Sequence, residues 1–91
     1  MAGSVVEELQ GIVDGLVARE RHSQLVRSLA NVIEAAHADE EHIAFDNLCH
    51  LVEYYRIHLT PAEFTRISNL AEHLDSAYVL DETNLASYVA E

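Results

Sequence analysis

The hexapeptide LTPAEF in the second half of the chain carries its strongest structural signal, because it fixes the start of a helix. Thr60 is expected to be the N-cap, Pro61 the first helical residue, and Glu63 the third residue, which completes a capping box. Leu59 and Phe64 have the spacing of a hydrophobic staple across that start. Proline also keeps Thr60 out of helical geometry, which a cap requires. The hexapeptide therefore predicts a helix that begins at Pro61.

Helical spacing recurs along the chain, whereas strand signals are missing. The sequence has no alternating β-branched run and no Asn-Gly or Asp-Gly hairpin turn. Ser4 and Glu7 have the spacing of a second capping box. Apolar residues at three- and four-residue spacing form four stripes: Val5, Leu9, Ile12, Val13, Leu16 and Val17; Leu25, Leu29, Val32, Ile33 and Ala36; Ala44, Leu48, Leu51, Val52 and Tyr55; and Phe64, Ile67, Leu70, Ala71 and Leu74.

The first two stripes require a break between them, although no glycine or proline separates them. At 100° per residue they lie about 150° apart around a single helix axis. A straight helix cannot bury both stripes against one core. We therefore expect a break within residues 19–23, with Ser23 as a candidate cap.

The end of the chain predicts a short last helix over residues 82–89. Its apolar residues Leu85, Tyr88 and Val89 would then cover the bundle. Ninety-one residues suffice for one modest core. Residues 1–91 are thus predicted to form a single all-α domain, a small bundle of four main helices plus a short C-terminal helix.

Two glycines lie within the first predicted helix. Gly11 and Gly15 fall on the side opposite its apolar stripe. Each costs about 1 kcal/mol relative to alanine at an exposed helical position. They indicate either a weak point in the helix or a flat face for close approach, and we favour the weak point because small residues four apart are a specific packing signal only in membranes.

The charge balance restricts the partners of this chain. Sixteen acidic residues against five arginines and no lysine give a formal charge of −11. Such a field repels nucleic acid and anionic membranes and attracts a basic protein, although acidity is also typical of a merely soluble protein. The N-terminus lacks the pattern of a signal peptide, no stretch approaches the roughly 20 apolar residues of a membrane span, and the single cysteine has no partner for an internal disulfide. We therefore expect a cytoplasmic protein.

Histidine and cysteine residues raise the question of catalysis or metal binding. Glu34 and His37 match half of the signature of di-iron helix bundles, but no second Glu-x-x-His and no HExxH motif exists. Cys49 and His50 are adjacent and point to different sides of a helix, so they cannot pair as nucleophile and base. The three glycines form no phosphate-binding loop. The sequence therefore predicts no enzyme activity, no metal and no cofactor.

The outer face of the helix that carries the third stripe is the remaining candidate site. Tyr54 is a large aromatic residue off the core stripe, and tyrosine is favoured at protein interfaces. Ile57 is expected on the same outward side, and the acids before the stripe suit the first turn of the helix. The alternative is an ordinary solvated helix face. We call the following residues the acidic ridge and predict that they bind a basic protein: Asp39, Glu40, Glu41, Asp46, His50, Glu53 and Tyr54.

The same region carries an ordered series of motifs: an acid-bearing turn, a helix with an alanine, an acid and "NLC", then tyrosines and acids, an LTPAEF turn, and a helix with Ile…Leu-Ala…Leu spacing. This series resembles the MafI-type immunity proteins of bacterial polymorphic toxin systems. The turn HADEEH departs from that pattern, which has a glycine before the acid. The resemblance spans a little under half of the chain, and the matching residues are Glu41, Ala44, 46–49, 53–55, 59–64 and 67–74.

The resemblance implies a function. Proteins of this family bind a cognate toxin domain, often a nuclease, and neutralise it inside the producing cell. It implies a basic nuclease as the partner, bound without a cofactor and without contact to nucleic acid or membrane. The alternative is an acidic helical adaptor or a regulatory inhibitor of another basic protein, including a nucleic-acid mimic. The toxin, its substrate and the oligomeric state stay open at this point.

Overall fold

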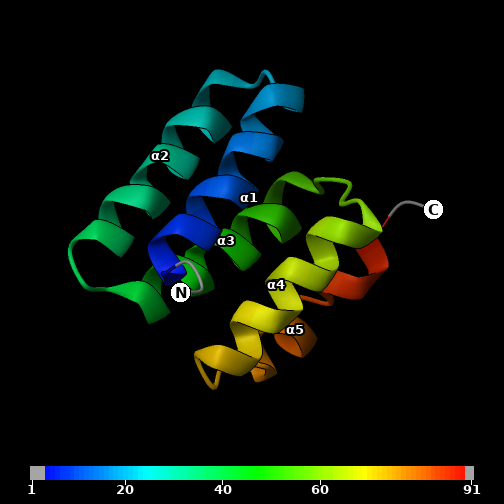
Figure 1. The fold of residues 1–91 in the computed structure, drawn as a ribbon. Coiled ribbons are helices and arrows are strands. Elements are labelled where there is room, and N and C mark those ends of the chain that lie inside the picture. The colour runs from blue at the N-terminus through cyan, green and yellow to red at the C-terminus, as the bar shows by residue number, and fades with distance from the viewer. Residues whose placement is uncertain (1–3, 90–91) are drawn as a thin grey trace.

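Every regular element of residues 4–89 is a helix, which confirms the predicted all-α bundle of four main helices plus a short C-terminal helix. The computed structural model describes residues 4–89. Helices α1 and α2 run antiparallel side by side, α4 packs against α1, and α3 contacts α1, α2, α5 and η1, which makes α3 the central helix (Figure 1). The elements of the described residues are α1 (Val5–Arg19), α2 (Ser23–His37), α3 (Glu41–Tyr55), α4 (Pro61–His73), α5 (Tyr78–Glu82) and the 3-10 turn η1 (Leu85–Tyr88).

Both predicted capping boxes are present. Ser4 Oγ accepts a hydrogen bond from the N–H of Glu7 at 3.1 Å, and Glu7 Oε1 accepts one from the N–H of Ser4 at 3.0 Å. At the start of α4, Thr60 Oγ1 accepts from the N–H of Glu63 at 3.1 Å, and Glu63 Oε1 accepts from the N–H of Thr60 at 2.9 Å. Each box satisfies two backbone donors that the first turn of a helix leaves without an intrahelical partner.

The break between α1 and α2 lies where the stripe phases require it, but its predicted cap is wrong. Ser23 is the first residue of α2, and the N-cap is His22, with an extended backbone. The Nδ1 atom of His22 accepts a hydrogen bond from the N–H of Leu25 at 3.4 Å. Its ring also packs against Tyr55 of α3, with the ring centroids 5.3 Å apart. His22 therefore contributes both a capping acceptor and an aromatic contact to α3 at this helix start.

The four apolar stripes form the core, with five of their members at its margin. Val17, Ile33, Leu51, Tyr55 and Phe64 are half-buried, and every other member of the stripes is buried. The fully buried Phe45 and Cys49 of α3 join this core although neither belongs to a stripe. The stripes therefore correctly predicted which side of each helix faces the core. They underestimated how many residues of the central helix α3 are buried.

The predicted short C-terminal helix exists, but it covers Tyr78–Glu82 and the bounds predicted for it, residues 82–89, are wrong. The described residues at this end form the short helix α5 followed by the separate turn η1. Asn84 lies between them with a left-handed backbone (φ 51°), which stops helical propagation. The N–H of Leu59 donates to the carbonyl of Tyr88 at 2.9 Å, so this end of the chain is joined to the start of α4.

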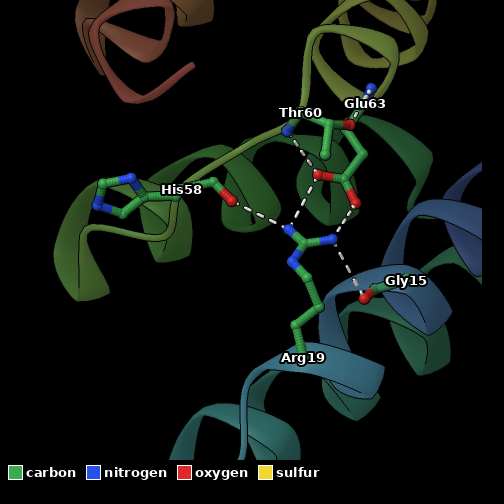
Figure 2. A network of polar contacts seen from close by, with 5 residues as sticks. All are labelled: Gly15, Arg19, His58, Thr60 and Glu63. Atoms are coloured by element: carbon green, nitrogen blue, oxygen red, sulfur yellow. Dashed lines mark hydrogen bonds and ion pairs between the residues drawn. The ribbon is translucent and has the colours of Figure 1, made fainter. Parts of the chain in front are cut away.

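The two glycines of α1 form a flat face and not the exposed weak point that we predicted. Both are half-buried at the contact with α4. A β-carbon at Gly11 would lie 2.5 Å from Nη2 of Arg66, and one at Gly15 would lie 3.2 Å from Oε2 of Glu63. Figure 2 shows the Glu63 carboxylate above the backbone of Gly15. Glycine at these positions leaves room for polar side chains of α4 to cross α1.

Four helices end in a left-handed residue that is not glycine. Asp39 follows α2, Arg56 follows α3, Asp75 follows α4 and Asn84 follows α5, with φ between 51° and 64°. This conformation normally favours glycine, and aspartate and asparagine tolerate it better than most residues. Asp39 lies in the turn HADEEH, where it takes the left-handed conformation that glycine would adopt without steric cost.

Candidate protein-binding site

The phase of α3 decides which of its side chains face outward. Its buried side consists of Ala44, Phe45, Leu48, Cys49 and Val52. Opposite to it, residues spaced by four, three and four positions form an exposed line, namely Ile43, Asn47, His50 and Tyr54. Asp46 and Glu53 are half-buried and run along one side of this line. The acidic ridge on α3 is therefore an exposed polar and aromatic line with carboxylates along one edge.

Tyr54 is the most exposed large apolar side chain of this face, and it is nevertheless held by packing. Its exposed fraction is 78%. The ring packs edge-on against Tyr55, with centroids 4.9 Å apart and an interplanar angle of 81°. Tyr55 in turn contacts the ring of His22. Because this aromatic chain restricts the orientation of Tyr54, less conformational freedom is lost when a partner covers it.

Asp46 and His50 are joined one turn apart on α3. The Nδ1 atom of His50 lies 2.8 Å from the backbone carbonyl oxygen of Asp46 and 3.6 Å from its Oδ1 atom. About half of each side chain is exposed. A carbonyl oxygen only accepts, so Nδ1 is the protonated nitrogen of this ring. The contact fixes the orientation of His50 on the acidic ridge.

A groove of about 410 Å³ runs between α2 and α3 beside this line. Helix α2 contributes Ser28, Asn31 and the buried Val32. Helix α3 forms the opposite wall of the groove with four residues, namely Asn47, His50, Leu51 and Tyr54. The walls carry amide and hydroxyl groups, whereas Val32 and Leu51 give the groove an apolar surface. Such a concavity offers both hydrogen-bond partners and contact area to a protruding side chain of another protein.

The upstream acids do not lie where the sequence predicted. Only Glu41 belongs to the first turn of α3. Glu40 is the N-cap and makes no side-chain capping bond, and Asp39 lies in the turn with its left-handed backbone. Because α3 rises about 1.5 Å per residue, these acids are roughly 20 Å from Tyr54 along the helix. The acidic ridge is therefore an extended surface and not a compact site.

Ile57 does not belong to the outer face, and that prediction is wrong. Its exposed fraction is 1%. Helix α3 ends at Tyr55, and the left-handed Arg56 reverses the direction of the chain. The N–H of Ile57 then donates to the carbonyl of Val52 at 3.0 Å, which places its side chain in the core. Helical phase cannot be extended past the residue at which the helix ends.

Several residues of this face were not predicted from the sequence. Ile43 is 53% exposed and Asn47 is exposed, and both fall on the line through His50 and Tyr54. The spacing of four, three and four residues was available in the sequence and would have identified them. No sequence signal pointed to Ser28 or Asn31, because their position beside α3 depends on how the two helices pack.

Cys49 is enclosed in the core beneath this face. Burial raises the pKa of its thiol to about 12, and the nearby Asp46 adds to that effect. The group is therefore a neutral thiol at physiological pH, and it packs as a small apolar side chain. One group of three candidate metal ligands exists among the described residues, formed by Asp46, His50 and Glu82.

Comparison of the chain with family models, with curated proteins and with solved structures finds no match to any of them. None of the helices in residues 4–89 has both the length and the hydropathy of a membrane span. The candidate site therefore rests on the geometry and charge of α3 and of the groove beside it.

Proposed function

We propose that this protein is an immunity protein that binds and neutralises a cognate bacterial toxin domain, a basic nuclease, through the acidic ridge. The observation that carries the proposal is the outer face of α3, where the packed but exposed Tyr54 stands at the rim of a groove and carboxylates run along one edge. An aromatic anchor with a charged surround is the arrangement found at energetically important centres of protein interfaces.

Charge supports a basic partner. The net charge of −11 and the absence of lysine give the whole molecule a negative field. A nuclease is positively charged where it holds phosphate groups, so this field would steer the two proteins together and speed their association. The same field disfavours nucleic acid as a direct ligand. Neutralisation then requires only that the bound protein cover the nuclease surface or a neighbouring one, without catalysis and without a cofactor.

The site of action in this proposal is the cytoplasm of the producing cell, where an immunity protein meets its toxin before export. The resemblance of the motifs in residues 33–75 to MafI-type immunity proteins supports this assignment. A helical adaptor for another basic protein would use the same surface, so the partner must be identified by experiment.

Co-expression tests the proposal. The chain is expressed in cells together with the toxin domain encoded beside its gene, and survival is compared with cells that express the toxin domain alone. We expect rescue by the wild-type chain and loss of rescue with Tyr54→Ala, at equal protein levels. A wild-type chain that fails to rescue would refute the immunity function. Rescue that is unaffected by Tyr54→Ala would place the binding site elsewhere.

A further inference from the structure

Three potential metal ligands meet where α3 contacts α5. Asp46 and His50 lie one turn apart on α3, and Glu82 is the last residue of α5. A ring nitrogen of His50 and one oxygen of each carboxylate all lie within 4.8 Å of one another. Two ligands bound to one Zn²⁺ ion are separated by at most about 4.2 Å, since each metal–ligand bond measures about 2.1 Å. The three groups are therefore within reach of one ion after side-chain rotation.

The imidazole distinguishes this group from a patch of surface carboxylates. Nδ1 of His50 donates to the carbonyl of Asp46 at 2.8 Å, so the neutral ring carries its lone pair on Nε2. A metal-binding histidine characteristically donates its other ring N–H to a carbonyl or carboxylate, which fixes the tautomer and the orientation of the ring. A nitrogen donor also favours transition-metal ions over Mg²⁺ and Ca²⁺, which prefer oxygen ligands alone.

The local charge adds a second reason to expect a cation. Asp46 and Glu82 are brought close together although like charges repel. Among the described residues, the arginine ion pairs join Arg19 to Glu63 and Arg66 to Glu8, so no arginine neutralises either carboxylate. The chain has no lysine that would do so. Within residues 4–89, His50 is thus the one basic group that forms an ion pair with Asp46.

We propose that Asp46, His50 and Glu82 form a binding site for a divalent transition-metal ion of the Zn²⁺ type, with water completing its coordination. Such an ion would join the end of α5 to the middle of α3. The sequence holds no signal for this site, because Asp46 and His50 show no motif by themselves and Glu82 is far from them along the chain. This site does not depend on the identity of any protein partner.

Calorimetric titration of the untagged full-length protein with ZnCl2 tests the proposal. We expect one saturable site per chain, and at least tenfold weaker binding for His50→Ala and for Glu82→Gln. His58→Asn is the matched control because His58 is also exposed and lies outside the group. MgCl2 and CaCl2 should bind at least tenfold more weakly than ZnCl2. Circular dichroism of each variant checks that the fold is kept.

Two results would overturn the proposal. One is equal weakening by His50→Ala and His58→Asn, which is the behaviour of scattered adventitious binding. The other is Zn²⁺ binding that Glu82→Gln leaves unchanged, because the ion would then not join α5 to α3. Hydrogen exchange gives an independent readout: Zn²⁺ should slow exchange of the backbone amides of α5 in the wild type and leave it unaltered in His50→Ala.

Discussion

The guanidinium group of Arg19 and the carboxylate of Glu63 form a two-point ion pair that joins the end of α1 to the start of α4 (Figure 2). Nη1 lies 2.6 Å from Oε2, and Nη2 lies 2.9 Å from Oε1. Nη2 also donates to the carbonyl of His58 at 2.9 Å. Glu63 therefore has two tasks, since the same carboxylate closes the capping box with Thr60. One side chain thus couples a local helix cap to the packing of two helices.

Replacement of Glu63 by glutamine should destabilise the fold more than the same change in the other capping box. Glutamine keeps a capping acceptor and loses the charge that pairs with Arg19, so we expect Glu63→Gln to lower the free energy of unfolding by about 1–2 kcal/mol, a range that allows for the partial exposure of Arg19. Glu7→Gln is the matched control because the described residues show no ion pair for Glu7, and it should cost less than about 0.5 kcal/mol. Denaturant unfolding measures both, and equal losses would contradict the coupling.

Acid should remove the contribution of Glu63. Burial opposes ionisation of its carboxyl group, but hydrogen bonds from Arg19 and Thr60 outweigh that effect and lower its pKa below the ordinary value of 4.5. Because the folded pKa is the lower one, ionised Glu63 stabilises the fold above pH 4.5, and this stabilisation is lost as the pH falls through the folded pKa. The stability difference between wild type and Glu63→Gln should therefore be constant above about pH 5 and shrink below it. A difference that is the same at pH 7 and at pH 3 would show that the ionised carboxylate contributes nothing.

Glycine at position 56 should stabilise the protein. Arg56 is exposed and has a left-handed backbone with φ 54° at the end of α3, a conformation that costs a non-glycine residue roughly 1 kcal/mol. We expect Arg56→Gly to raise the free energy of unfolding by about 0.5–1 kcal/mol. Arg27→Gly, in the interior of α2, is the control and should lower it by about 1 kcal/mol. Thermal unfolding of the two variants distinguishes the expected gain in stability from the expected loss. A loss of stability in both variants would exclude backbone strain at Arg56.

The sequence predicted those features of the fold that depend on a few neighbouring residues. The capping boxes at Ser4 and Thr60 involve residues three positions apart, and the apolar stripes follow from helical geometry alone. The prediction failed where a helix ends without glycine. Arg56 adopts a left-handed conformation that its residue type does not favour, and the prediction therefore misplaced Ile57. The left-handed Asn84 interrupts the single helix that was predicted over residues 82–89.

The candidate site was predictable to the extent that it lies on one helix. The phase of α3 correctly placed His50 and Tyr54 outside, and the same phase would have added Ile43 and Asn47. The groove was not predictable, because Ser28 reaches it through the packing of α2 on α3. The proposed metal site was not predictable either, because Glu82 reaches Asp46 and His50 only through the packing of α5 on α3. The close approach of α4 to the glycines of α1 likewise depends on how these two helices pack.

The binding constant for the partner that we propose, a basic toxin nuclease domain, measured as a function of salt, tests the central claim most directly. Between 50 and 500 mM salt the Debye length changes roughly threefold, so binding steered by the acidic ridge should weaken markedly over this range. We expect Glu53→Lys to weaken binding at least tenfold at low salt, mainly through slower association, and to flatten the salt dependence. Glu72→Lys on α4, which changes the net charge equally, should alter binding less than twofold. Equal effects of the two reversals, or an affinity that does not change with salt, would contradict recognition through the acidic ridge.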